Sequence, residues 1–189
     1  MMKYLQKLGK AIMLPVAVLP VAAIMMGIGY AMCPATMQGG DVTGIIQIIG
    51  FALVKIGSAV IDKLPMLFAV GVAIGLSKDQ HGAAGLAGLV AFLTVTTVLN
   101  SGVVATMMGA EEAPLAFSKI DNAFIGSISG ITASVCYNKF SSAQLPTALA
   151  FFSGKRCVPI VTSFVMVAES AILYFVWPML FNALVWVGE

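Results

Sequence analysis

Residues 157–177, CVPIVTSFVMVAESAILYFVW, form a run of 21 residues with one charged side chain, Glu169. An α-helix rises about 1.5 Å per residue, so a helix of this length crosses the roughly 30 Å hydrocarbon core of a bilayer. Inside that core a helix satisfies all of its own backbone polar groups. The run therefore predicts a transmembrane helix that begins near Cys157 and continues past Trp177.

The composition of the whole chain indicates a membrane protein. Apolar residues make up 60% of the sequence and charged residues 10%, and the mean hydropathy is +1.01, far from the averages of soluble domains. The net charge of +2 comes from lysines near segment ends and does not form a basic field that would bind nucleic acid. We expect an all-α integral protein of the cell membrane, with about five transmembrane helices and short amphipathic or re-entrant segments.

The first apolar span covers residues 11–32 and contains Pro15 and Pro20, which predict a bend. Three lysines precede it and favour a cytoplasmic N-terminus: Lys3, Lys7 and Lys10. Apolar residues among them recur at helical spacing and predict a short interfacial helix: Tyr4, Leu5, Leu8 and Ile12. A signal peptide has a similar layout, but the small-residue cleavage pattern is poor and more apolar spans follow.

The second span, residues 42–61, carries Lys55 about two turns from its polar end. Lys55 is either a substrate or ion ligand or, as we favour, a side chain that extends to the interface. Two shorter apolar stretches, residues 64–77 and 82–98, flank the polar residues 78–81. They form either two short elements around a polar turn or one long helix, and His81 is expected in a solvated turn.

The polar stretch from Asn100 to Asn122 is expected outside the membrane, with Glu111 and Glu112 solvated. A further span covers residues 123–137, and residues 141–149 form a connector. Two glycine pairs at small-xxx-small spacing predict close helix packing: Gly71 with Gly75, and Gly126 with Gly130.

Gly154, Lys155 and Arg156 stand directly before the last span, where a basic pair is either an interface anchor or a site for an anionic ligand. Glu169 is a second candidate, because a carboxylate at membrane depth is costly without a partner. Lys55 and Glu169 are one possible pair. The three cysteines match no disulfide or CxxC pattern, one histidine excludes a histidine metal cluster, and no nucleotide-binding or hydrolase motif occurs. We expect no catalytic residue, metal or cofactor.

Three runs carry a family resemblance: LQKLGKAIMLPVAVLPVAAIMMGIG, LPMLFAVGVAIGLSKDQHGAAGLAGLVAF and LPTALAFFSGKRCVPIVTS. They resemble enzyme IIC, the sugar-translocating membrane component of bacterial phosphoenolpyruvate-dependent phosphotransferase systems, and most closely its glucose, glucosamine and N-acetylglucosamine branch. The resemblance implies a transporter that moves such a sugar while a IIB partner phosphorylates it from a phosphocysteine. Cys157 does not match that phosphocysteine motif.

Members of this family are much longer, and the resemblance covers their N-terminal half, which builds the scaffold and the homodimer contact. We therefore expect residues 1–189 to be a scaffold half, with the C-terminal sugar-site half and the IIB domain absent and the chain inactive alone. Lys155 and Arg156 would then lie on the cytoplasmic side, near a phosphate-bearing partner or product or among lipid headgroups. The alternative function is a non-transporting fragment that only dimerises or associates with full-length permeases.

Overall fold

The structure, a computed structural model, describes the backbone of residues 2–188 and the side chains of residues 6–147 and 149–188. The side chains of Tyr4 and Leu5, part of the predicted interfacial helix, lie outside the described residues. Residues 1–12 and 65–189 form one compact unit, called here the bundle unit, and residues 13–64 form the other, the hairpin unit. The helical elements are α1 (Met2–Val16), α2 (Leu19–Met32), α3 (Ala35–Gln38), α4 (Ile45–Asp62), α5 (Leu64–Leu76), α6 (Gly82–Val98), α7 (Ser101–Met108), α8 (Leu115–Ser118), α9 (Ala123–Phe140), η1 (Thr147–Phe152), η2 (Gly154–Arg156) and α10 (Cys157–Gly188).

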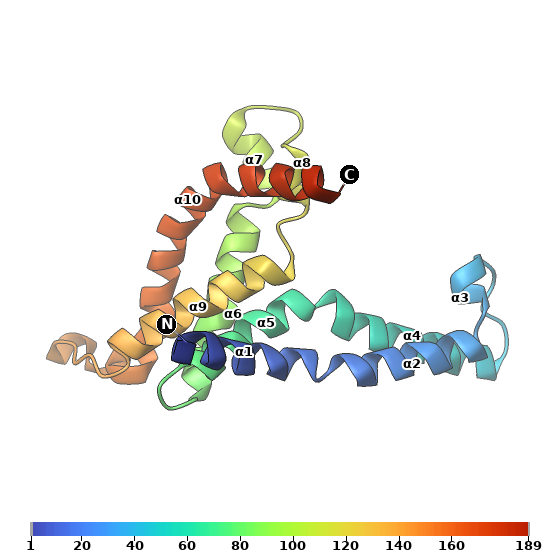
Figure 1. Cartoon of the computed structure of the whole chain (residues 1–189), viewed down its shortest axis with the longest axis horizontal. Helices are drawn as coiled ribbons and strands as arrows, with labels where there is room; N and C mark the ends of the chain where they lie inside the picture. The colour runs from blue at the N-terminus through green and yellow to red at the C-terminus, as the bar shows by residue number, and fades with distance from the viewer. Residues whose placement is uncertain (1, 189) are drawn as a thin grey trace. The chain divides into compact units, whose positions relative to one another are not determined.

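In the hairpin unit, α2 and α4 lie side by side along most of their length (Figure 1). They approach closely because glycines lie at the contact between them. A Cβ on Gly29 would lie 2.6 Å from the Gly50 carbonyl oxygen, and a Cβ on Gly57 would lie 2.7 Å from the Ala22 carbonyl oxygen. The helix of the predicted first span is interrupted at residues 17–18, between its two prolines, and the bend expected there stays a prediction. The span predicted at 42–61 corresponds to α4.

In the bundle unit, α5 lies among α1, α6 and α9. Ala11 of α1 meets Gly75, and Leu8 and Ile12 of α1 pack on the same cluster. The α6 residue Gly88 would place a Cβ 2.5 Å from the Ala69 carbonyl oxygen. The α9 residue Gly130 would place one 2.7 Å from that same oxygen, and Gly126 of α9 meets Pro65. The packing predicted from the spacing of Gly126 and Gly130 is therefore confirmed, as is a packing role for Gly75.

Helices α6, α9 and α10 pack against one another and complete the core of the bundle unit. Ile125, Tyr137, Val158 and Met166 are fully buried there. Helix α10 contains Pro178, continues to Gly188 and changes direction along its length (Figure 1).

The polar stretch between residues 100 and 122 is more structured than expected, because it contains α7 and α8. Asn100 caps α7 by accepting a hydrogen bond from the Gly102 amide, and Gly109 ends it in a left-handed conformation. Helices α6 and α7 meet at a 48° bend. Glu111 and Glu112 are exposed in the loop that follows, as predicted.

The prediction of an all-α membrane protein is confirmed. Among the described residues three helices are long and apolar enough to cross a bilayer, and a fourth span results if α6 and α7 are counted together. Fewer than five qualify because α5 has only 13 residues and because α9 carries several serine, threonine and asparagine residues.

Candidate functional site

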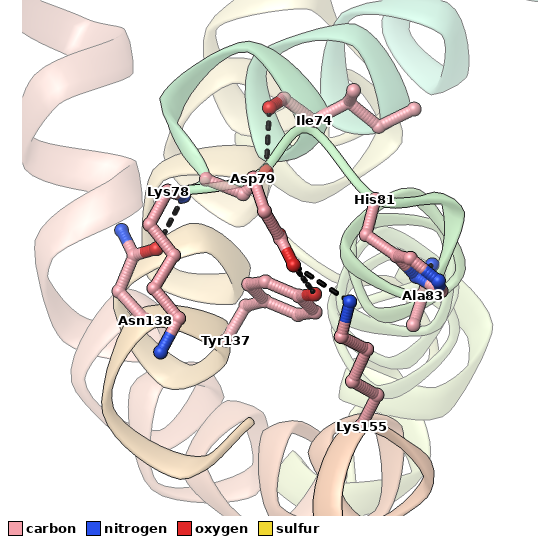
Figure 2. Close-up of polar contacts among 9 residues, drawn as sticks. Ile74, Lys78, Asp79, His81, Ala83, Tyr137, Asn138 and Lys155 are labelled. Atoms are coloured by element: carbon pink, nitrogen blue, oxygen red, sulfur yellow. Dashed lines mark hydrogen bonds and ion pairs between the residues drawn. The ribbon is translucent and has the colours of Figure 1, made fainter. Parts of the chain in front are cut away.

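The loop of residues 77–81 joins α5 to α6 and carries Asp79, the centre of the most extensive polar network in the part of the chain described (Figure 2). Of the two arrangements that the sequence left open, the chain adopts two helices around a polar turn. Gln80 has a φ of 51°, a left-handed conformation uncommon for residues other than glycine, so the turn is tight.

Asp79 is paired with Lys155, which lies 76 residues later in η2 (Figure 2). The Lys155 Nζ atom is 2.6 Å from Asp79 Oδ2, the one ion pair within 4 Å among the described residues. The Tyr137 hydroxyl of α9 donates to the same oxygen at 3.0 Å. The Lys155 hydrogen bond is the main cause that lowers the pKa of Asp79 from 3.8 to about 2, and the Tyr137 hydrogen bond adds to it.

Hydrogen bonds from two other helices also hold the backbone at this loop. The Asn138 side chain accepts from the Lys78 amide at 2.8 Å and donates to the Leu76 carbonyl at 3.1 Å. Lys7 of α1 donates to the Leu76 and Ser77 carbonyls at 3.1 and 3.2 Å. Three elements distant in sequence, α1, α9 and η2, therefore converge on one loop. We call this network the loop latch: Lys7, Asp79, Tyr137, Asn138 and Lys155.

His81 occupies the exposed turn that was predicted for it. Its Nδ1 accepts from the Ala83 amide at 3.1 Å and so caps α6. The imidazole also stacks on Tyr137, with ring centroids 6.5 Å apart.

Arg156 does not join the latch, although it adjoins Lys155. Its guanidinium donates to the Phe151 carbonyl at 3.3 Å and lies 4.9 Å from the centre of the Phe151 ring. The side chain is exposed and its charge faces no carboxylate among the described residues. The two neighbouring cations thus have different partners: Lys155 is neutralised within the protein, and Arg156 is available to an external anion.

The other two predicted site residues are not members of the latch. Lys55 is exposed on α4 in the hairpin unit, with its Nζ 5.3 Å from the centre of the Phe51 ring. Glu169 lies midway along α10 in the bundle unit, where its Oε1 is buried and has no hydrogen-bond partner. Their pairing stays a prediction.

The two ends of the bundle unit carry opposite charge. The 77–81 loop and the segments next to it carry one carboxylate, Asp79, and five cations: Lys7, Lys78, Lys139, Lys155 and Arg156. Residues 109–122 lie at the opposite ends of α6 and α9 and carry three carboxylates and one cation: Glu111, Glu112, Asp121 and Lys119. We call these the basic end and the acidic end.

The chemistry of the latch is electrostatic and structural. No group of three His, Cys, Asp or Glu side chains among the described residues is arranged to hold a metal. Sequence reasoning identified Lys155 but missed Asp79, Tyr137, Asn138 and Lys7. The polar residues 78–81 were a signal, but they were considered only as a break in the helix and not for the side chains that they could bind.

Comparison with known proteins gives two findings. The family model described as "Phosphotransferase system, EIIC" matches residues 9–189. The PTS system N-acetylglucosamine-specific EIICB component of Bacillus subtilis (strain 168) is 37% identical over 180 residues, which cover 94% of this chain and 33% of that protein. The chain thus spans about a third of the length of the curated relative that it matches.

Proposed function

The chain belongs to the EIIC family of the phosphotransferase system, and we propose that it is part of a sugar permease. This permease carries a sugar across the cell membrane while a IIB partner phosphorylates the sugar. The observation that carries this proposal is the family match over residues 9–189, on a fold of long apolar helices. The Bacillus subtilis relative is named as specific for N-acetylglucosamine. The proposed substrate is accordingly a hexose or amino sugar of the glucose, glucosamine or N-acetylglucosamine type.

We propose that this part of the permease is its helical scaffold and contributes to a homodimer contact. The glycine-mediated packing of α5, α6 and α9 supports a rigid role, because backbones in such close contact leave little freedom to move. In this proposal the sugar site and the phosphocysteine reside in the part of the permease that corresponds to the remaining two thirds of the relative.

We further propose that the basic end of the bundle unit faces the cytoplasm. Lysine and arginine are retained on the cytoplasmic side of membrane proteins, and the basic end has five cations against one carboxylate. Lys7 belongs to that end, since it binds the 77–81 loop, so the N-terminus of the chain would also lie on the cytoplasmic side.

Within this arrangement the loop latch fixes the cytoplasmic 77–81 turn on α9 and η2. Lys155 is a positioning residue because its charge is already paired with Asp79. Arg156 is the member of the basic pair that would contact a headgroup or a phosphate-bearing partner. For Glu169 we propose a contact with a further helix of the permease, since its Oε1 is buried and unpartnered. The exposed Lys55 fits an anchor at the membrane interface.

A hybrid permease tests the proposed function. In it, this chain replaces the matching 180 residues of the Bacillus subtilis relative, and phosphoenolpyruvate-dependent phosphorylation of N-acetylglucosamine is measured in membrane vesicles. We expect the hybrid to phosphorylate the sugar and this chain alone to be inactive. A hybrid that inserts into the membrane but is inactive with glucose, glucosamine and N-acetylglucosamine would favour the non-transporting alternative.

The same hybrid tests the basic pair. If Lys155 and Arg156 bind a phosphate-bearing partner, the K155Q/R156Q variant should bind the IIB partner more weakly and phosphorylate the sugar more slowly. If they serve the latch and the interface, activity is retained wherever the variant remains folded.

A further inference from the structure

An apolar groove of about 590 Å³ lies at the basic end of the bundle unit. Its walls are the last residue of α9, the segment of residues 143–152 and the first turns of α10. Phe140, Leu145, Phe152 and Phe164 are among the lining residues, all of which are apolar. Phe164 is 73% exposed, so the groove is open at the protein surface.

The walls of the groove are held by hydrogen bonds. The Gly154 amide donates to the Ala143 carbonyl at 2.8 Å, and the Leu145 amide donates to the Ser153 hydroxyl at 3.0 Å. These two bonds close the segment of residues 143–154 into a loop, and Gly154 adopts the left-handed φ of 71° that the closure needs. The groove is therefore part of an ordered segment.

Two cations sit beside the groove, each over an aromatic ring. Lys139 places its Nζ 5.6 Å from the centre of the Phe140 ring, which lines the groove. Arg156 lies 4.9 Å from the centre of the Phe151 ring, and Phe151 packs edge-to-face on the lining residue Phe152. Both cations thus stand next to groove walls. In the sequence, Lys139 precedes the connector between α9 and α10, and Arg156 follows it.

The segments that form the groove carry cations and no carboxylate. Residues 139–164 contain three cations and no aspartate or glutamate. Lys155 is neutralised by Asp79, and neither Lys139 nor Arg156 forms an ion pair among the described residues. An apolar groove with two uncompensated cations beside it favours a ligand that has a long apolar part and a compact anionic head.

We propose that this groove binds an anionic phospholipid, with an acyl chain between Phe140, Phe152 and Phe164 and the headgroup phosphate between Lys139 and Arg156. A soluble phosphate would use the cations and leave the groove unfilled, and the groove offers a sugar no polar partner. An anionic lipid matches both features, and guanidinium groups bind phosphate oxygens well.

The test measures lipid binding to the purified chain in detergent by native mass spectrometry. Phosphatidylglycerol and phosphatidylcholine with identical acyl chains are compared for the wild type and for K139Q/R156Q. A cation near an anionic surface contributes about 1 kcal/mol, so two cations predict roughly 30-fold tighter binding of phosphatidylglycerol. K139Q/R156Q is expected to bind the two lipids within about threefold of each other.

Two controls separate the groove from general electrostatics. K55Q/K119Q removes the same charge elsewhere and is expected to keep the preference for phosphatidylglycerol. I160W fills the groove without changing charge and is expected to weaken phosphatidylglycerol binding, since Ile160 lines the groove. Equal binding of both lipids by the wild type, an equal loss in K55Q/K119Q, or full binding by I160W would each overturn the proposal.

Discussion

Replacing Gly130 with alanine tests the close packing of α9 on α5. The added Cβ would lie 2.7 Å from the Ala69 carbonyl oxygen and 2.8 Å from the Val72 Cβ, whereas ordinary contacts begin at 3.4 Å. Relieving that overlap requires one helix to move by several tenths of an ångström, and overpacking of this kind costs about 1–3 kcal/mol. Alanine also favours the helix by about 1 kcal/mol relative to glycine, so the free energy of unfolding should fall by about 0–2 kcal/mol in total.

The matched control is Gly27→Ala, the same change in the interior of α2. A Cβ on Gly27 has no neighbour within 4 Å, so this variant should be more stable by about 1 kcal/mol, which is the difference in helix propensity between alanine and glycine. The difference between the two variants isolates the contact at about 1–3 kcal/mol. In a chain of this size that is a difference of about 2–12 °C in Tm, measured by tryptophan fluorescence in detergent. Equal shifts of Tm in the two variants would refute the packing described for α5 and α9.

Three further predictions concern polar groups of the bundle unit. The partners of Asp79 lower its pKa from 3.8 to about 2, so its ion pair with Lys155 stabilises the fold above about pH 4 and loses this effect toward pH 2. The wild type should therefore have a higher Tm than D79N/K155Q above about pH 4, and this difference should vanish toward pH 2. Trp177→Phe should cost about 1–3 kcal/mol in thermal unfolding, since it removes a buried hydrogen bond of 2.7 Å, while Trp186→Phe, at an 80% exposed residue, should change little. Glu169→Gln should raise Tm, because Oε1 is buried without a partner and an amide is less costly to bury than a carboxylate; a lower Tm would indicate a partner.

The sequence was sufficient to predict the elements that depend on local pattern. The helices predicted at 42–61, 123–137 and from Cys157 onward correspond to α4, α9 and α10, although α9 is not among the helices that are long and apolar enough to span a membrane. The polar residues 78–81 were correctly placed between two apolar stretches, and His81 in an exposed turn. Each of these follows from hydropathy, helix length or a break in the apolar pattern, which act over short distances along the chain.

The loop latch was beyond such reasoning. Asp79 and Lys155 are 76 residues apart, and Tyr137 looks like any aromatic residue near the end of a span. No spacing rule relates them, because their meeting depends on how α5, α9 and η2 pack. Helix α7 was missed for a different reason: its cap Asn100 and its terminal Gly109 were visible, but the polarity of the stretch around them was weighted more heavily.

We propose that the bundle unit crosses a membrane with its basic end in the cytoplasm. Single cysteines at Lys78 and at Glu112 test it, because both positions are exposed and the three native cysteines are buried. In intact cells a membrane-impermeant maleimide should label E112C and should label K78C only after the membrane is permeabilised. Labelling of both positions from outside, or of K78C alone, would contradict this orientation of the bundle unit.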